Sequence, residues 1–124
     1  MFGNTKAFSG FAVNDLQRAK QFYTETLGLH VTEEDGMLFL HIAGGRSILV
    51  YPKDDHAPAT YTILNFPVPD IEAAVDALTA RGVSFERYPQ FKSDEKGITR
   101  DSGGPAIAWF TDPSGNIFSV LQED

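Results

Sequence analysis

Apolar and polar positions repeat one pattern twice along the chain. The stretch Phe11–Ala19 (FAVNDLQRA) is answered by Phe66–Ala74 (FPVPDIEAA), with Phe, Val, Asp and Ala at one constant offset. Each copy ends an apolar strand, places an Asp after it and begins a helical pattern. Self-similarity at a fixed period is typical of an internal repeat. Because two copies are too few for a solenoid, we expect two similar half-modules that share one core.

The first half predicts a strand, a helix and three more strands. Apolar residues from Leu16 to Leu27 recur on one helical face. Asn14 or Asp15 can cap the start of this helix, and Gly28 is placed to end it. The later connections are short, which favours an antiparallel meander. The predicted strands cover residues 8–13, 29–33, 37–43 and 47–51.

The second half predicts the same order of elements. Asp70 should cap a helix over residues 71–81, and Gly82 should end it. Pro67 has no N–H to donate, so we expect the strand that contains it to lie at a sheet edge. The irregular stretch 89–105 is long, and loops of this length often carry function. The predicted strands cover residues 61–68, 83–88, 106–111 and 116–122.

These elements predict an α+β fold built from two βαβββ modules. The first module covers residues 7–53 and the second covers residues 61–122, with a polar, proline-containing linker at 54–60. A chain of 124 residues has the size of one compact domain and can bury a core without disulfides. We therefore expect a single domain made of two half-modules.

Composition excludes several kinds of chemistry. The chain has no cysteine, so disulfides, zinc–thiolate sites and cysteine nucleophiles are ruled out. No apolar run approaches the ~20 residues that span a bilayer. The first residues lack the charged-then-apolar layout of a secretory signal. We expect a cytoplasmic protein that does not enter a membrane.

The charge balance is acidic. Seventeen acidic and ten basic residues give a formal net charge of −7, which argues against nucleic-acid binding because that function relies on Lys and Arg to neutralise phosphates. A general contribution to solubility explains this excess. An acidic groove that attracts a cationic ligand is the alternative explanation.

A known family shares these motifs. The first helix carries a Val-x-Asp-Leu-x-x-Ala-x-x-Phe-Tyr pattern that ends in Leu-Gly-Leu, and an Asp-Pro-x-Gly-Asn turn precedes the last strand. The chain thereby resembles the vicinal oxygen chelate superfamily, which includes glyoxalase I, extradiol dioxygenases, and fosfomycin- and bleomycin-resistance proteins. The resemblance implies a half-open barrel around a cavity, and a homodimer. The residues that carry it are Val13, Asp15, Leu16, Ala19, Phe22, Tyr23, Leu27, Gly28, Leu29, Asp112, Pro113, Gly115 and Asn116.

The same resemblance locates the metal ligands of the family's enzymes. Its four ligand positions correspond here to Phe8, Ile63, Ser119 and either Leu49 or Tyr51. Phe and Ile have no N or O donor, and weak hydroxyls do not hold a divalent ion. The three histidines, His30, His41 and His56, show no His-x-His or i, i+4 spacing. We predict no metal and no other cofactor.

Strand alternation and the repeat predict the walls of the cavity. Most of the candidates are apolar, with a few polar points, as is usual for a small-molecule site. Arg100 in the long loop could recognise a carboxylate or phosphate, or could be a solvated loop charge. Phe91 in the same loop could act as a lid or as a hydrophobic anchor. The candidate residues are Phe8, Leu49, Tyr51, Ile63, Asn65, Arg100, Trp109 and Ser119.

Three functions are compatible with this sequence. The first is a metal-free protein that binds and sequesters a small organic ligand, either cationic or aromatic. The second is a glyoxalase- or dioxygenase-like enzyme with an atypical site. The third is a structural or regulatory dimer whose cavity is filled by its own side chains. No Ser-His-Asp arrangement is readable that would replace the metal, so catalysis is less favoured than binding.

Overall fold

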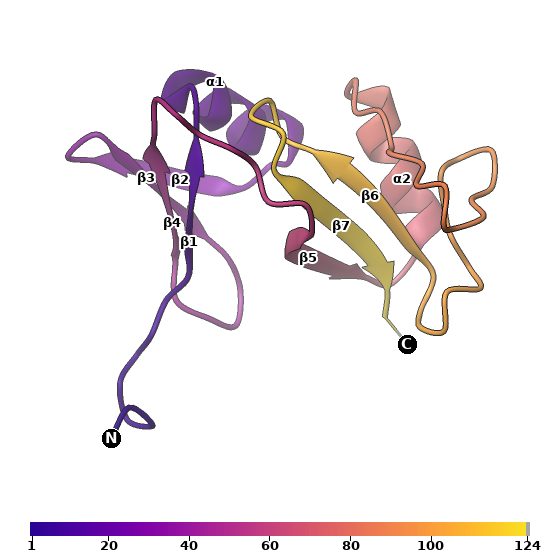
Figure 1. The fold of residues 1–124 in the computed structure, drawn as a ribbon, viewed down its shortest axis with the longest axis horizontal. Coiled ribbons are helices and arrows are strands. Elements are labelled where there is room, and N and C mark those ends of the chain that lie inside the picture. Colours follow the sequence, from indigo (N-terminus) through magenta and orange to yellow (C-terminus); the bar gives the residue numbers. More distant parts are fainter. Residues whose placement is uncertain (124) are drawn as a thin grey trace. The chain divides into compact units, whose positions relative to one another are not determined.

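The computed structural model describes residues 1–123, and the chain divides into two compact units. The boundary lies between Ala57 and Pro58, inside the stretch 54–60. The first unit contains one four-stranded sheet, and the second contains one three-stranded sheet (Figure 1). Over residues 1–123, no helix is long and apolar enough to cross a membrane.

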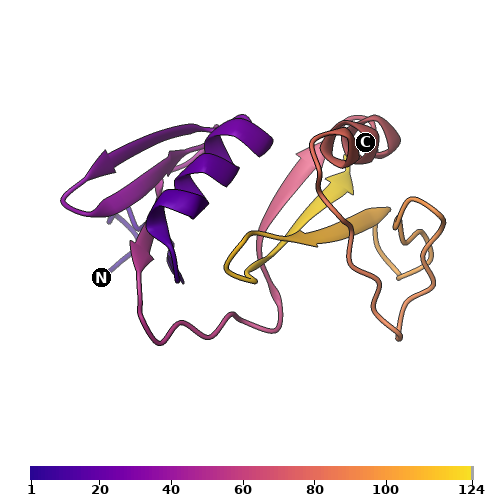
Figure 2. The same cartoon turned by 90° about the horizontal axis from the view of Figure 1, so that it is seen from above.

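The first unit has the βαβββ order that the sequence predicts. Its sheet has the order β1-β4-β3-β2, in which β1 is parallel to β4 and the other neighbours are antiparallel. The helix lies along one face of this sheet (Figure 2). The elements are β1 (Gly10–Val13), α1 (Leu16–Gln21), the π-helix η1 (Phe22–Thr26), β2 (His30–Glu34), β3 (Met37–His41) and β4 (Ile48–Pro52).

The first helix begins at Asp15, which resolves the choice between Asn14 and Asp15. The Asp15 carboxylate accepts a hydrogen bond of 3.1 Å from the N–H of Arg18, as an N-cap should. The last turn widens into η1 before the chain reverses at Gly28. Fully buried side chains from the helix and the sheet form this unit's core: Val13, Ala19, Tyr23, Leu38, Leu40 and Val50.

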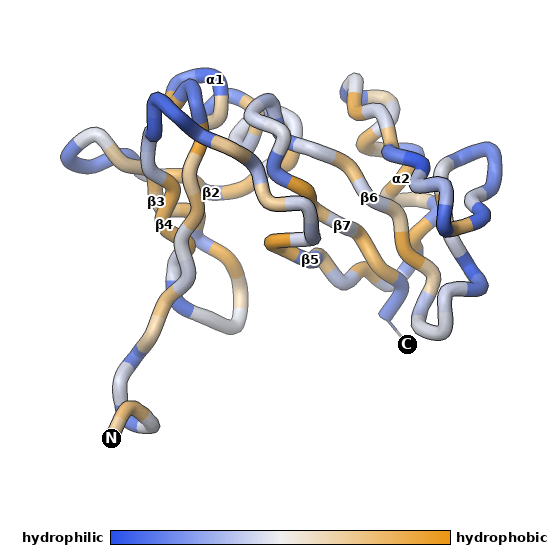
Figure 3. The backbone as a smooth tube through the Cα atoms, in the orientation of Figure 1, coloured by the Kyte–Doolittle hydropathy of each residue, from blue (hydrophilic) through white to orange (hydrophobic). Residues whose placement is uncertain are grey.

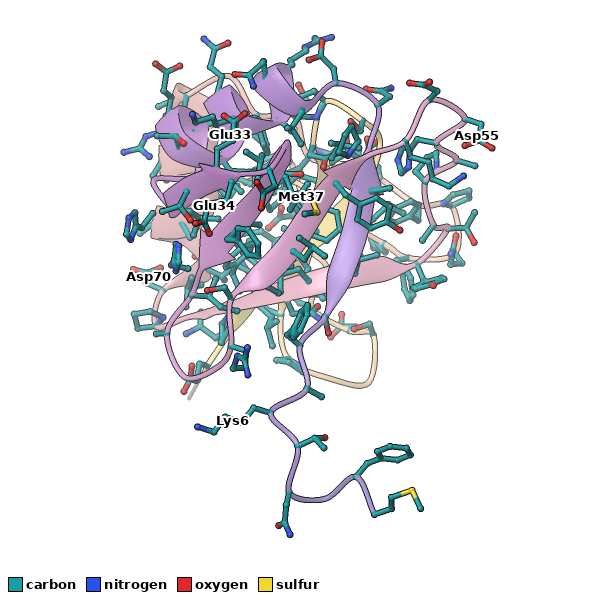
Figure 4. The ribbon with its side chains drawn as sticks, turned by 90° about the vertical axis from the view of Figure 1, so that its left-hand side faces the viewer. Lys6, Glu33, Glu34, Met37, Asp55 and Asp70 are labelled. Atoms are coloured by element: carbon teal, nitrogen blue, oxygen red, sulfur yellow. The ribbon has the colours of Figure 1, made fainter. Side chains whose placement is uncertain are left out.

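Glu33 ties β2 to the helix. Its carboxylate receives hydrogen bonds from Gln17 Nε2 at 3.2 Å and from Lys20 Nζ at 3.0 Å. Figure 4 shows Glu33 on the side of the sheet where α1 lies. These bonds hold one face of the sheet against the helix. Met37 and Phe39 lie on the opposite face of the sheet, away from the helix.

The second unit has a sheet of order β5-β7-β6. Its strands are β5 (Thr62–Val68), β6 (Ile107–Thr111) and β7 (Ile117–Gln122), and its helix is α2 (Ile71–Ala80). Asp70 caps α2 through a hydrogen bond of 3.2 Å from the N–H of Ala73. Strand β5, which contains Pro67, lies at a sheet edge as expected.

Edge-to-face aromatic contacts connect the core of this unit. Phe110 packs against Phe118 and Phe85, with ring centroids 5.6 and 5.8 Å apart. Val75 of α2 is also buried. The hydropathy of the backbone follows this arrangement, with apolar residues along β6 and β7 and polar residues in the loop after α2 (Figure 3).

Most predicted strands differ from the observed ones by one or two residues at their ends, and three larger or site-related predictions are wrong. Residues 83–88 form no strand, because only Glu86 bridges to Trp109. The first strand begins at Gly10, so Phe8 precedes it. Strand β5 begins at Thr62 and has a register irregularity between Thr62 and Leu64, which breaks strict alternation at Ile63.

Candidate functional site

The second unit contains a cavity with aromatic walls. Its volume is about 230 Å³, slightly below the ~300 Å³ at which typical small-molecule sites begin. Four aromatic side chains line it, and none of its lining side chains carries a charge. The lining residues are Thr60, Tyr61, Thr62, Tyr88, Gln90, Phe91, Trp109 and Ile117.

Trp109 of β6 is held at the centre of these aromatic walls. Its indole Nε1 donates a hydrogen bond of 3.1 Å to Thr62 Oγ1. The Phe91 ring stacks on the indole, with centroids 5.2 Å apart and planes 25° apart. The Tyr88 ring meets the indole edge-on at 5.4 Å. Hydrogen bonding and ring packing therefore fix the indole from three sides.

The irregularity in β5 makes the Trp109–Thr62 bond possible. Thr62 pairs with Ile117 of β7, and Asn65 pairs with Ser119. Paired residues place their side chains on the same face, so Thr62 and Asn65 share a face although they are three positions apart. Trp109 pairs with Ser119 from the other side and lies on that face too. A regular strand would have turned Thr62 away from the indole.

Tyr88 is a titratable group of the cavity wall. Burial, and after it the negative charge of Glu86, raises the pKa of the Tyr88 phenol above its ordinary value. The phenol therefore stays protonated at neutral pH and can donate or accept a hydrogen bond. The wall offers an incoming molecule ring faces, hydroxyls and the Gln90 amide, but no strong acid or base.

Asn65, Ser119 and Trp109 form one row across the second sheet. Ser119 is fully buried, and its Oγ donates a hydrogen bond of 2.5 Å to Asn65 Oδ1. The structure brings these three predicted residues together, although only Trp109 lines the cavity. Ile63 lies at the irregularity in β5 and is half-buried.

Arg100 lies in an ionic cluster and not among the residues that line the aromatic cavity. Its Nη2 is 3.5 Å from an Asp94 oxygen and 3.7 Å from a Glu72 oxygen. Lys96 joins the cluster through Glu72, at 3.7 Å, and also pairs with Asp76 at 3.0 Å. A separate cavity of about 350 Å³ lies beside α2, with Lys96 among its lining residues. The cluster connects the irregular loop to α2.

Phe8, Leu49 and Tyr51 belong to the first unit. The Phe8 side chain is 56 % exposed, and the Arg46 guanidinium lies 5.5 Å from the centre of its ring. Leu49 and Tyr51 lie on the sheet face opposite the buried Ile48 and Val50. A single cavity that includes these three residues together with those of the second unit stays a prediction.

Phe8, Ile63 and Ser119, at three of the positions that the resemblance assigns to metal ligands, do not fit a divalent metal. Phe8 and Ile63 offer no donor atom, and the Ser119 hydroxyl is already bonded to Asn65. Among residues 1–123, no three His, Asp or Glu side chains gather in a group that could hold a metal ion. These three side chains therefore supply no free strong donor for a divalent ion.

Two histidines nevertheless lie together on the first sheet. His30 of β2 and His41 of β3 are cross-strand partners whose rings stack 4.6 Å apart. The ring nitrogens of His41 lie 2.9 Å from Thr32 Oγ1 and 3.0 Å from Ser47 Oγ. The sequence did not reveal this pair, because a hairpin and not a helical spacing brings the two residues together.

Sequence reasoning found Trp109 but missed most of its surroundings. Tyr88 lies in a predicted strand that does not form, and Thr62 depends on an irregularity that leaves no mark in the sequence. The sequence predicts Phe91 only as a lid or as a hydrophobic anchor. The available signal was the density of aromatic residues on both sides of the irregular stretch: Tyr61, Phe85, Tyr88, Phe91 and Trp109.

Comparisons with known proteins identify the family. Residues 7–120 match the model of the Glyoxalase/Bleomycin resistance protein/Dioxygenase superfamily. No curated protein matches. A superfamily member from Sphaerobacter thermophilus has a similar fold, with a TM-score of 0.70, 23 % identity, and 94 % of this chain and 97 % of that chain covered.

Two further structures share the fold. An antibiotic-binding protein from Streptomyces sp. CB03234 has a TM-score of 0.67 and 23 % identity, with 98 % of each chain covered. A fosfomycin resistance protein from Listeria monocytogenes has a TM-score of 0.70 and 18 % identity, with 95 % of this chain and 92 % of that chain covered. With most of its length matched by the family model, the chain belongs to the glyoxalase/bleomycin resistance protein/dioxygenase superfamily.

Proposed function

We propose that this protein binds and sequesters a small organic molecule that carries an aromatic ring. The observation that carries the proposal is the fixed indole of Trp109, which Thr62 orients and which aromatic rings surround. Fixed aromatic faces bind rings with little loss of conformational entropy. The ligand would be held without the divalent metal that most enzymes of the superfamily use.

Phe91 suggests how a ring would enter. It covers one face of the indole and belongs to the irregular stretch 89–105, not to the sheet. A ligand ring that displaces Phe91, or slides between it and Trp109, keeps the stacking that it replaces. An exchange of one ring contact for another costs little, which suits reversible binding.

The structural neighbours support a small-molecule role. One is an antibiotic-binding protein and another is a fosfomycin resistance protein. Their identities to this chain are only 23 % and 18 %. The chemical class of its ligand must therefore be inferred from the residues that line its own cavity. The aromatic walls favour drugs or metabolites with fused or single aromatic rings.

A thermal-shift panel of aromatic drugs and metabolites tests the proposal. A ligand at 100 times its dissociation constant should raise the free energy of unfolding by about 2.7 kcal/mol. The shift should disappear in Trp109→Leu, which keeps an apolar side chain but loses the ring. Shifts that persist in Trp109→Leu would place binding elsewhere, and a panel without any shift would argue for a cavity filled by its own side chains.

An enzyme of the glyoxalase or dioxygenase type is the alternative. The adjacent imidazoles of His30 and His41 favour it, because imidazole is a common ligand of borderline metals. Metal analysis of protein purified without chelator distinguishes the two functions. Stoichiometric zinc, nickel, iron or manganese that His41→Ala removes would support the enzyme, while protein that retains no metal would support ligand binding.

We also propose that the protein is a cytoplasmic homodimer. Among the described residues, no strand pairs with the outer edges of β1, β2 and β5. Open strand edges are normally covered, and pairing with a second copy is one way to cover them. Light scattering at micromolar concentration should give twice the mass of 13.6 kDa, and a monomer mass would refute the dimer.

A further inference from the structure

Glu86 lies next to the aromatic cavity through its backbone pairing. Its N–H donates a hydrogen bond of 2.7 Å to the carbonyl oxygen of Trp109, in an isolated antiparallel bridge. Residues paired in this way direct their side chains to the same face. The Glu86 carboxylate is therefore on the side of the sheet that carries the Trp109 indole.

The carboxylate of Glu86 has no cationic partner in the described part of the chain. Within residues 1–123, no ion pair or side-chain hydrogen bond involves it, and the residue is exposed. The acids around the ionic cluster differ, because Glu72, Asp76 and Asp94 all lie within 3.7 Å of a Lys or Arg nitrogen. Glu86 is thus an uncompensated negative charge beside a cavity without charged lining residues.

The field of Glu86 reaches the cavity wall. After burial, it is the second cause that raises the pKa of the Tyr88 phenol, and Tyr88 lines the cavity. A negative charge that hinders ionisation of a wall residue also stabilises a positive charge placed in the same region. The faces of the aromatic rings add to this attraction, since their quadrupoles favour cations.

We propose that the Trp109 cavity selects aromatic organic cations, such as ring compounds with a protonated amine, and that Glu86 supplies the counter-charge. This inference rests on the proposed function. The ring stacks on Trp109 and the ammonium group faces Glu86. The charge of Glu86, rather than the overall acidity of the chain, sets the preference for cationic ligands.

A pair of matched probes tests the inference. 1-Naphthylmethylammonium and 1-naphthalenemethanol have the same ring and nearly the same shape but differ in charge. Calorimetric titrations would measure both with the wild-type protein and with Glu86→Gln, Glu95→Gln and Trp109→Leu. Glu95 is the control, because it loses the same charge while lining the separate cavity beside α2.

We expect the ammonium probe to bind about threefold to fivefold more tightly than the alcohol, as exposed ion pairs allow. Glu86→Gln should remove this difference and leave the affinity of the alcohol unchanged, while Glu95→Gln should alter neither. Raising the ionic strength to about 0.15 M should weaken only the ammonium probe. Together these results would support Glu86 as the selecting residue.

Two other outcomes would refute the inference. The first refutes only cation selection, and the second also refutes ring stacking. If both probes bind equally, lose affinity in Trp109→Leu and ignore Glu86→Gln, cation selection is refuted and ring stacking survives. If neither probe binds to the wild-type protein, both the inference and the ring-stacking form of the proposed function are refuted.

Discussion

The indole Nε1 of Trp109 and the hydroxyl of Thr62 are joined by a hydrogen bond of 3.1 Å between two strands that are not neighbours in the sheet. Strand β7 lies between β5 and β6, and its residue Ile117 pairs with Thr62. The bond therefore spans the sheet face and sets the angle at which the ring faces the cavity.

Replacement of Thr62 by Val should loosen the indole. The variant keeps the shape of the side chain but removes the acceptor, so the free energy of unfolding should fall by about 1 kcal/mol. Acrylamide should quench the fluorescence of Trp109 more readily, and the signal is specific because the chain has one tryptophan.

Thr60→Val is the matched control for this change. Thr60 lines the same cavity, but no hydrogen bond to its hydroxyl is present among the described residues. Equal quenching in the two variants would contradict the positioning role of Thr62.

Phe91→Ala should uncover one face of the indole. The lost stacking contact is worth about 0.5–1.5 kcal/mol beyond area burial, so the variant should be less stable and its tryptophan emission should shift to longer wavelength. Phe2→Ala, at a side chain that is 76 % exposed, should change neither quantity. Unchanged emission in Phe91→Ala would show that the stack does not persist in solution.

A comparison of Gly97 with Gly103 distinguishes backbone strain from steric clash when a side chain is added. Both have φ of +90°, which disfavours any L residue. A Cβ at Gly97 would also lie 2.8 Å from the Cβ of Phe85, whereas a Cβ at Gly103 would meet nothing within 4 Å. Gly97→Ala should therefore reduce the free energy of unfolding clearly more than Gly103→Ala in urea titrations. Equal losses would mean that the loop moves away from Phe85 without cost.

Asp94 should make stability depend on pH in acid. Partial burial opposes its ionisation, but the N–H groups of Ile98 and Lys96 together with the Arg100 charge outweigh that effect and lower the pKa of the carboxyl below its ordinary value. A lowered folded-state pKa adds stability above the unfolded value of about 3.9, and this stability is lost as the pH falls through the folded value.

Asp94→Asn tests that dependence. The amide oxygen can still accept the N–H bonds, each 2.9 Å long in the wild type, so the variant isolates the charge. The wild-type protein should be more stable above pH ~4, by up to about 1 kcal/mol because the ionic contacts are exposed, and the difference should vanish in stronger acid. A difference between the wild-type protein and Asp94→Asn that grows in acid would refute the argument.

The sequence could predict the parts of this fold that local chemistry determines. Asp15 and Asp70 cap the two helices because a carboxylate after a strand can accept from the first helical turn. Asp112 organises the turn before β7 in the same local way, accepting from the N–H groups of Ser114 and Asn116 at 3.0 and 2.9 Å. Such bonds span few residues, so their spacing is visible in the sequence.

The parts that the sequence did not predict depend on contacts between distant residues. Residues 83–88 have the apolar alternation of a strand, but only Glu86 finds a partner. The irregularity between Thr62 and Leu64 reverses which side chains face the indole. Phe91 reaches Trp109 from a loop. No local pattern encodes these three features, and together they make the cavity.

The indole N–H resonance of Trp109 tests the central claim most directly. Because the chain has one tryptophan, a ¹H–¹⁵N spectrum contains one indole signal, which can be followed during titration with 1-naphthalenemethanol. We predict that this signal moves until the cavity is saturated, with a dissociation constant equal to the calorimetric value, and that Gly103→Ala behaves in the same way. An indole signal that stays in place while calorimetry reports binding would contradict the assignment of the Trp109 cavity as the ligand site.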